Sequence, residues 1–261
     1  MKARIAGIGA WGPGFNSADT LMAIIDSGEP AVGSDEAAAT RPAATVIPPR
    51  ERRRAPLSVK LAVEAAGQAC TAAEVEPAEA ACVFVSALGD LDITDYMCRT
   101  LASDTPQLSP TKFHNSVHNA PVGYWSISTG NHHAGNAVAA GPDYSLAASL
   151  MEAFIQCEVE QRPVLWVTQD IAAPAAYQPL WPVDHACAFA LLLLPCADEA
   201  ATRLERTGQP AEWPPLEHPT LTGLYNDNPS ARVLALLQAH QFGEPVDLPL
   251  APGQGLRISL P

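Results

Sequence analysis

Short continuous apolar runs alternate along this chain with longer stretches whose apolar residues recur at helical spacing. Continuous runs are typical of strands buried on both faces, and they occur at residues 4–9, 80–89, 162–170 and 185–195. Helical spacing occurs at residues 17–28, 57–74 and 92–103, after Asn119, and after Gly141. This alternation predicts an α/β fold with a mixed or largely parallel sheet that is covered by helices on both faces.

Capping residues mark the ends of two of these helices. Ser17 supplies a hydroxyl N-cap for the first helix, and Gly28 ends it. Asn119 can cap the short helix, with Pro121 in its first turn, where a missing N–H costs little.

The pattern weakens after residue 196. Residues 206–219 are rich in turn formers, residues 226–240 predict one further helix capped by Asn or Asp, and the tail can add one strand. We therefore expect a larger part, residues 1–196, and a shortened C-terminal part, residues 197–261, packed against it. Residues 29–56, which are rich in Pro, Ala and charge, predict a surface loop.

A strand–turn–helix elbow spans residues 137–154, AVAAGPDYSLAASLMEAF. In one large class of enzymes such an elbow carries a nucleophile at the start of the helix, where the helix N-terminus lowers the pKa of a thiol. Here the turn consists of Gly141, Pro142, Asp143, Tyr144 and Ser145, so no thiol is available. A carboxylate is a poor acyl acceptor, and Ser145 lies too far into the helix.

Composition limits the possible partners and compartment. With 261 residues and 48% hydrophobic content, the chain can bury a substantial core. Its net charge of −13 argues against binding to nucleic acid or to an anionic membrane surface. No apolar run is long enough to span a bilayer, and the N-terminus enters the strand pattern directly, so we expect a cytoplasmic protein. The six cysteines are scattered, which favours buried thiols over a metal site or disulfides.

A glycine motif near the N-terminus suggests a second class of function. Gly7, Gly9 and Gly12 form the G-x-G-x-x-G pattern of dinucleotide-binding folds. The helix that follows begins too late to direct its dipole at a phosphate, however, and no acidic residue ends a second strand at the expected distance. A dinucleotide-binding enzyme is therefore a weak alternative.

Two further clusters have both a functional and a structural interpretation. His114 and His118 could form a metal pair on a helix, but Pro110 and Pro121 bracket them and no carboxylate lies nearby, which favours structural histidines. The arginines within residues 50–54 could receive a phosphopantetheine phosphate or an acidic carrier protein, or could belong to a solvated loop.

Two stretches together resemble a known family. Residues 4–28, RIAGIGAWGPG followed by LMAIIDSG, resemble the opening of β-ketoacyl synthases, and residues 109–153 resemble their dimer-interface helix, strand and nucleophile elbow. The combination of Phe113, Asn115, Ser116, Asn119, Ala120, Gly123, Tyr124 and Trp125 is similar to the short ketosynthase-like proteins called chain length factors of aryl-polyene assembly lines. The resemblance covers residues 3–196. It implies the N-terminal ketosynthase half of a thiolase-like fold, a mixed five-stranded sheet covered by helices on both faces, with a shortened C-terminal part.

Departures from the family pattern carry the functional expectation. Catalytic ketosynthases hold a Cys at the elbow and take two histidines from their second half, whereas this chain lacks the Cys and has no H-G-T-like motif. His218 and His240 lie in settings that do not match. The resemblance therefore implies a chain length factor that has no catalytic activity of its own and uses no cofactor.

Such a subunit would heterodimerise with an active β-ketoacyl synthase and shape its acyl tunnel in aryl-polyene, polyketide or fatty-acid-like biosynthesis. It would meet the acyl carrier protein only indirectly. The alternative is an acyl-transfer or decarboxylating enzyme that uses a residue such as Ser145.

The same resemblance predicts the residues that line the shared interface and tunnel. They are Phe113, His114, Asn115, Val117, His118, Asn119, Tyr124, Trp125, Asn136 and Val138. Because neighbouring residues on a helix point about 100° apart, at most one of Tyr124 and Trp125 should face the tunnel.

Overall fold

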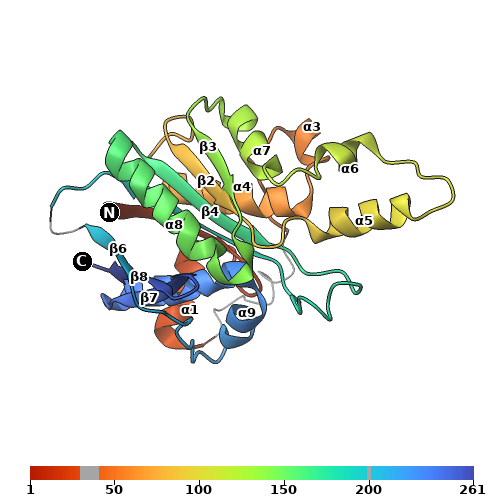
Figure 1. Ribbon diagram of the computed structural model, residues 1–261. Helices are drawn as coiled ribbons and strands as arrows, with labels where there is room; N and C mark the ends of the chain where they lie inside the picture. Colours follow the sequence, from red (N-terminus) through yellow and green to blue (C-terminus); the bar gives the residue numbers. More distant parts are fainter. Residues whose placement is uncertain (30–40, 199–200) are drawn as a thin grey trace.

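Eight strands form one mixed sheet between two layers of helices in the computed structural model, which describes residues 1–29, 41–198 and 201–261 (Figure 1). The strand order is β3-β2-β4-β5-β1-β6-β8-β7. The strands are β1 (Lys2–Trp11), β2 (Ala81–Val85), β3 (Gly135–Val138), β4 (Val164–Asp170), β5 (Cys187–Leu194), β6 (Thr202–Thr207), β7 (Val246–Ala251) and β8 (Gln254–Ser259).

The first five strands form the mixed sheet expected from the sequence. β2 lies parallel to both β3 and β4, whereas β5 runs antiparallel between β4 and β1. Every residue of β2 and β4 is buried, which explains why their sequences are continuous apolar runs rather than alternating ones.

The helices begin and end close to the positions that the sequence predicts. In α1 the Ser17 side chain accepts a hydrogen bond from the Thr20 amide, and Gly28 ends the helix in a left-handed conformation. The helices are α1 (Ala18–Ser27), α3 (Pro49–Arg52), α4 (Leu57–Ala72), α5 (Leu91–Leu101), α6 (Pro110–His114), α7 (Ala120–Thr129), α8 (Gly141–Glu160), α9 (Thr222–Asp227) and α10 (Val233–Phe242), with a 3₁₀ helix, η1 (Pro229–Arg232).

Alternate residues of the central strands face two different cores. Val83 and Trp166 point into a core that includes side chains from α1, α8 and α10. Phe84 and Leu165 point into the opposite core, under α4 and α7. The sheet is thus covered on both faces, as its apolar strands require (Figure 1).

The glycine motif belongs to β1 and not to a phosphate-binding turn. Gly7 and Gly9 lie inside the strand, where α4 crosses it closely. A Cβ atom at Gly7 would overlap the carbonyl oxygen of Ala69, and one at Gly9 would overlap that of Ala65. These glycines permit close packing of helix on strand.

The C-terminal part is more regular than the sequence pattern predicts. It contributes three strands instead of one, because β6 pairs with β1 and a β7–β8 hairpin extends the sheet. The expected helix at residues 226–240 is divided into the end of α9, η1 and α10, with Pro229 at the start of η1. The boundary between residues 196 and 197 stays a prediction.

Part of the loop expected at residues 29–56 lies outside the described residues, namely residues 30–40. The described remainder contains the short helix α3, and Ile47 and Ala55 are buried there. Within the described ranges, no helix has the length and apolar character needed to cross a membrane.

Candidate functional site

The elbow joins the end of β3 to the start of α8. Gly141 has a φ of 72°, a left-handed conformation that glycine adopts without strain, and it lets the chain turn into the helix. The Ser145 hydroxyl donates a hydrogen bond to the Gly141 carbonyl at 2.6 Å and accepts one from the Ala140 amide at 2.7 Å. Because the Ser145 side chain is also buried, its hydroxyl serves to close the turn.

Asp143 occupies the first turn of α8, where a carboxylate interacts favourably with the helix N-terminus. Nη1 of Arg232 lies 2.9 Å from the Asp143 carboxylate and also donates to the Pro142 carbonyl at 3.3 Å. The guanidinium in turn lies over the Trp213 ring, 5.2 Å from its centroid. Arg232, in the C-terminal part, therefore contacts two residues of the elbow and stabilises the start of α8.

None of the four buried cysteines belongs to the elbow, and all four are poor nucleophiles. Burial raises the pKa of Cys70, Cys82 and Cys157 to about 12, and it raises the pKa of Cys187 well above its ordinary value. These thiols therefore stay protonated near neutral pH, and a protonated thiol neither attacks a thioester nor binds a metal well.

His218 has a structural role. Its Nδ1 accepts hydrogen bonds from the amides of Thr220 and Leu221, at 3.2 and 3.3 Å, so the proton resides on Nε2. Nε2 then donates to the Ile24 carbonyl at 2.9 Å. These three bonds tie the chain before α9 to α1.

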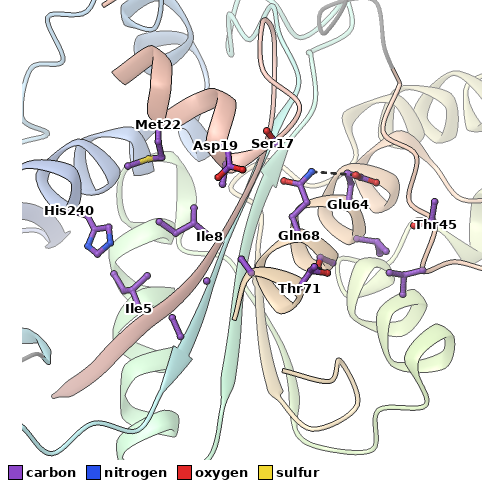
Figure 2. A pocket seen from close by; sticks show the side chains of 17 residues that line it. Ile5, Ile8, Ser17, Asp19, Met22, Thr45, Glu64, Gln68, Thr71 and His240 are labelled. Carbon is purple, nitrogen blue, oxygen red and sulfur yellow. Dashed lines mark hydrogen bonds between the residues drawn. The ribbon is translucent and has the colours of Figure 1, made fainter. Parts of the chain in front are cut away.

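A hollow of about 680 Å³ lies between β1, α1 and α4, and His240 of α10 borders it (Figure 2). Burial lowers the pKa of His240. Two polar side chains of the hollow bind the chain's own backbone: Gln68 accepts from the Ala10 amide at 3.0 Å, and Glu64 accepts from the Ala44 amide at 2.6 Å. The structure does not describe residues 30–40, which connect α1 to the segment that contains Ala44. The volume of the hollow is therefore the space left by the described residues alone.

A second cavity, of about 540 Å³, lies between α3, α6 and α7. Four of the predicted interface residues line it, namely His114, Val117, Asn119 and Tyr124. Burial raises the pKa of the Tyr124 phenol, which therefore stays neutral near pH 7. We call this hollow the α3–α6–α7 cavity. Its lining overlaps the interface residues that the sequence predicts.

Exposed apolar side chains surround the same region. Ile127 also lines the cavity and is 84% exposed, and Phe113 on α6 is 60% exposed. Large apolar side chains that gather on a surface mark a binding site or an interface. Ile127 is not among the residues predicted from the sequence, although its position three residues after Tyr124 places it on the same side of α7.

The remaining predicted residues connect α6 and the turn after it to their neighbours. Asn115 is buried and donates to the Arg54 carbonyl at 3.2 Å, which holds α6 against the end of α3. Nε2 of His118 donates to the Val138 carbonyl of β3 at 3.3 Å. The two histidines of the possible metal pair do not share a helix, because α6 ends at His114.

Trp125 does not belong with the surface residues. It is fully buried and packs against Phe84, with ring centroids 6.5 Å apart, because it lies on the side of α7 that faces the sheet. Tyr124, its neighbour, faces the α3–α6–α7 cavity. Trp125 is therefore removed from the set of tunnel candidates.

β3 forms one end of the strand order and pairs with β2 alone within the described sheet. α7 covers one face of this edge and α8 covers the other (Figure 1). Asn136 of β3 donates to Oε1 of Glu152 on α8 at 3.1 Å. The outer backbone groups of β3 are available to another chain.

A buried carboxylate that the sequence did not reveal lies at the ends of β2 and β4. Asp170 accepts from the hydroxyls of Ser86 and Ser230, each at 2.7 Å, and from the Leu88 amide at 3.1 Å. Burial raises the pKa of Asp170. These hydrogen bonds join η1 and the residues after β2 to the end of β4, so the Asp170 carboxylate has a structural role. In the sequence, Asp170 is marked only as an acidic residue at the end of an apolar run.

No group of three or more His, Cys, Asp or Glu side chains in the described ranges is arranged to hold a metal ion. The arginines at positions 50, 53 and 54 are exposed, and no ion pair involves them within the described part of the chain. Arg52 donates to the Ala43 carbonyl at 3.0 Å.

Solved structures with the same fold include ketosynthase complexes. A chain from the ketosynthase ApeO in complex with its chain length factor ApeC, from Xenorhabdus doucetiae, superposes with a TM-score of 0.72 at 22% identity over 99% of both chains. A chain from the ishigamide ketosynthase/chain length factor superposes with a TM-score of 0.69 at 15% identity, over 100% of this chain and 99% of the other. At these identities the likeness shows the fold.

A larger ketosynthase matches over part of its length. The ketosynthase from module 1 of the bacillaene synthase of Bacillus amyloliquefaciens FZB42 has a TM-score of 0.57 at 12% identity, over 87% of this chain and 50% of that one. No curated protein sequence matches the chain. Residues 28–240 match the sequence model of the β-ketoacyl synthase N-terminal domain, so the match starts later and extends further than residues 3–196. The chain therefore belongs to the β-ketoacyl synthase family, by its N-terminal domain, and it has the thiolase-like fold.

Proposed function

We propose that this protein is a non-catalytic chain length factor. In this role it forms a heterodimer with an active β-ketoacyl synthase in the cytoplasm and supplies part of the wall of the acyl tunnel. The pathway would be of the aryl-polyene, polyketide or fatty-acid-like type. The acyl carrier protein would deliver its thioester to the partner's active site.

The elbow carries this proposal. A ketosynthase reaction requires a nucleophile at the start of the helix, and here that position offers Gly, Pro and an ion-paired Asp. The Ser145 hydroxyl is buried, and both of its hydrogen bonds lie within the turn. Attack by Ser145 would need the turn to open and a base to remove its proton.

Three surface features support a role as partner. Within the described sheet β3 is an edge strand, α7 packs on it, and a cavity between α3, α6 and α7 has exposed apolar side chains around it. Natural proteins cover such edges and patches with another chain. A subunit without catalysis can then contribute one wall of a shared tunnel.

The lengths of the related structures also support the proposal. This chain matches, almost end to end, chains from complexes that contain a ketosynthase and a chain length factor. It spans half of the bacillaene synthase ketosynthase. The near end-to-end match to chains of such complexes supports a role as a partner subunit.

The isolated protein should remain unmodified when it is incubated with acyl-carrier or acyl-coenzyme A thioesters. Intact mass spectrometry is the measurement, and a catalytic ketosynthase treated in parallel provides the positive control. A stoichiometric acyl adduct that maps to residues 141–145 would contradict the proposal.

Ser145→Ala separates the structural role of this hydroxyl from a catalytic one. As a structural group, Ser145 stabilises the turn by about 0.5–1.5 kcal/mol, so its loss should lower the melting temperature slightly. Product formation by the complex with the ketosynthase should not change. Loss of activity in a complex that still assembles would favour the acyl-transfer alternative.

A further inference from the structure

The 3₁₀ helix η1 connects the C-terminal part to the ends of the central strands. The Asn228 side chain caps η1 and donates to the carbonyls of Asp170 and His185, at 3.2 and 2.9 Å. The Ser230 hydroxyl donates to the Asp170 carboxylate at 2.7 Å. Asn228 and Ser230 are both buried, which strengthens these hydrogen bonds. The start of η1 is therefore fixed to the end of β4 and to the residues before β5.

Arg232 lies at the other end of η1, in a position that does not by itself suit a cation. It is the N-cap residue of α10, and its side chain makes no cap hydrogen bond there. A helix N-terminus carries partial positive charge, which disfavours a basic side chain. The guanidinium instead extends to the first turn of α8, where Nη1 lies 2.9 Å from the Asp143 carboxylate and 3.3 Å from the Pro142 carbonyl oxygen. The charge of Arg232 is therefore explained by the elbow and not by its own helix.

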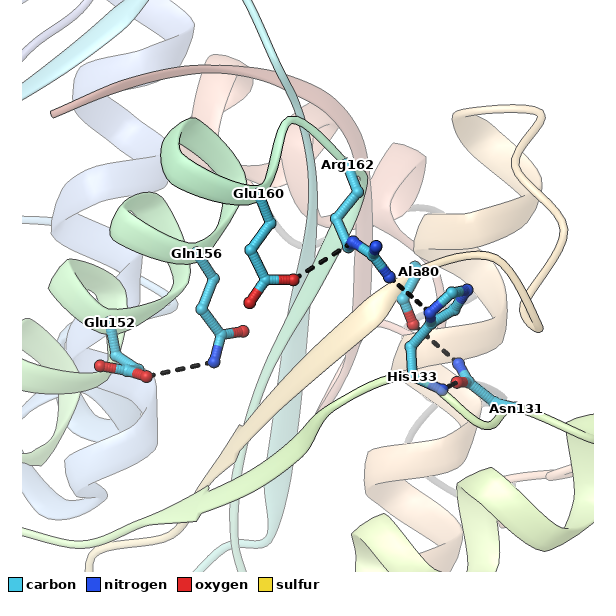
Figure 3. Close-up of polar contacts among 7 residues, drawn as sticks. All are labelled: Ala80, Asn131, His133, Glu152, Gln156, Glu160 and Arg162. Carbon is cyan, nitrogen blue, oxygen red and sulfur yellow. Dashed lines mark hydrogen bonds and ion pairs between the residues drawn. The ribbon is translucent and has the colours of Figure 1, made fainter.

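The far end of α8 is held by separate contacts (Figure 3). Glu160 forms an ion pair of 3.2 Å with Arg162, which also contacts the His133 side chain ahead of β3. Glu152, in the middle of α8, accepts from Asn136 of β3 at 3.1 Å. These contacts join the second half of α8 to β3 and to the residues before it. They leave the opposite junction, where β3 ends and α8 begins, to the elbow's own hydrogen bonds and to the arginine of η1.

The elbow at that junction is exposed. Residues 139–141 are exposed, and the Asp143 side chain is 63% exposed. A Cβ atom at Gly141 would meet nothing within 4 Å beyond its chain neighbours, so no described side chain supports the turn at that point. The elbow also continues β3, which is an edge strand of the described sheet. Its shape therefore determines the surface next to the open edge of β3.

We infer that Arg232 is a positioning residue, which holds the elbow in the shape in which the elbow and the open edge of β3 bind the ketosynthase. The inference rests on the proposed function and names the residue through which the C-terminal part contributes to partner binding. Arg232 acts through Asp143 and Pro142 and need not touch the partner. A loop that already has its bound shape binds more tightly, because affinity falls with the fraction of molecules in which the loop must first be ordered.

Arg232→Met removes both contacts with the elbow and keeps an unbranched apolar side chain against Trp213. It also removes a cation from the start of α10, so the melting temperature should change little. Arg232→Lys is the conservative variant, because one nitrogen makes both contacts and a lysine Nζ can replace it. Arg257→Met is the matched control, since Arg257 pairs with Asp247 at 3.5 Å across the β7–β8 hairpin. If Arg232→Met does not fold, Asp143→Asn removes the same ion pair from its exposed side.

Hydrogen exchange of the isolated proteins, followed by mass spectrometry of peptides that cover residues 137–147, reports on the elbow. The Ala140 amide donates to the Ser145 hydroxyl, so it is protected while the turn is closed. Exchange in these peptides should be about 5-fold faster in Arg232→Met than in the wild type. Arg232→Lys and Arg257→Met should exchange at the wild-type rate. Equal exchange of the elbow in the wild type and Arg232→Met would overturn the inference.

Binding of the four proteins to the ketosynthase encoded beside this protein's gene is the functional readout. Arg232→Met should bind about 5-fold more weakly than the wild type, whereas Arg232→Lys and Arg257→Met should bind as the wild type does. Faster exchange of the elbow with unchanged affinity would overturn the inference and leave the proposed function in place. A ketosynthase that binds none of the four proteins would contradict the proposed function, and the exchange result would still show whether Arg232 holds the elbow.

Discussion

Replacing Trp125 with alanine should destabilise the protein, whereas replacing its neighbour Tyr124 should change what the complex makes. Trp125 is fully buried against Phe84 in the core under α7, and truncating a buried Trp costs about 3–5 kcal/mol. Each kcal/mol lowers the melting temperature of a chain of this size by about 2–4 °C, so we expect a drop of about 6–20 °C. That loss is a large fraction of a typical total stability of about 5–15 kcal/mol.

Tyr124 lines the α3–α6–α7 cavity, so Tyr124→Ala enlarges a space and leaves the core beneath it intact. The stability cost should be about 1–2 kcal/mol. In a complex reconstituted with the ketosynthase and acyl carrier protein, mass spectrometry should find longer acyl products. Tyr124→Phe keeps the ring and should leave the length distribution unchanged.

Thermal unfolding and product length together separate the two roles. If Tyr124→Ala and Phe113→Ala both leave the product length unchanged in intact complexes, the α3–α6–α7 cavity does not limit the chain. If Trp125→Ala lengthens the product without lowering the melting temperature, the assignment of Trp125 to the core is wrong.

Three further substitutions test the account of the fold. Gly9→Ala places a methyl group against the Ala65 carbonyl and should cost about 1–3 kcal/mol or more in urea unfolding, unless α4 can move away from β1 at no cost. Asp170→Ala leaves the hydroxyls of Ser86 and Ser230 without their acceptor and should cost about 3 kcal/mol; a neutral result would contradict the network. Burial lowers the pKa of His240 in the native state from 6.5, so stability should be fully present above that pH and fall as the pH drops below it. His240→Gln should reduce this loss of stability. If the wild type and the variant lose stability equally as the pH falls, another group causes the loss.

Much of the fold could be predicted because local signals agreed with the tertiary structure. The apolar runs that became β2, β4 and β5 are buried on both faces, so their composition alone identifies them. Ser17 and Gly28 marked α1 correctly, since the hydrogen bonds of a cap are local. The glycine motif misled because the contact that requires Gly7 and Gly9 comes from α4, far along the chain.

The C-terminal strands lacked such signals. β6 alternates buried residues with Arg203 and Glu205, so its hydrophobicity is low, and Pro249 interrupts the pattern of β7. Proline is tolerated there because β7 is the last strand of the sheet and need not donate to a further neighbour.

The interface residues taken from the sequence lie along α6, α7 and β3, and their role in an interface stays a prediction. The choice between Tyr124 and Trp125 depends on the rotation of α7, which the sequence does not reveal. The contact of Arg232 with Asp143 joins residues that are distant in the sequence, so it could be found only in the structure.

Intact mass spectrometry of the co-expressed pair shows whether this chain pairs with the ketosynthase without itself reacting with the acyl thioester. The protein is purified together with the ketosynthase encoded beside it, and the complex is incubated with an acyl thioester. We expect a one-to-one complex in which the ketosynthase chain gains the acyl mass and this chain keeps its own mass. A stoichiometric acyl adduct on this chain, or a ketosynthase that purifies without it, would show that this protein is not a non-catalytic partner subunit.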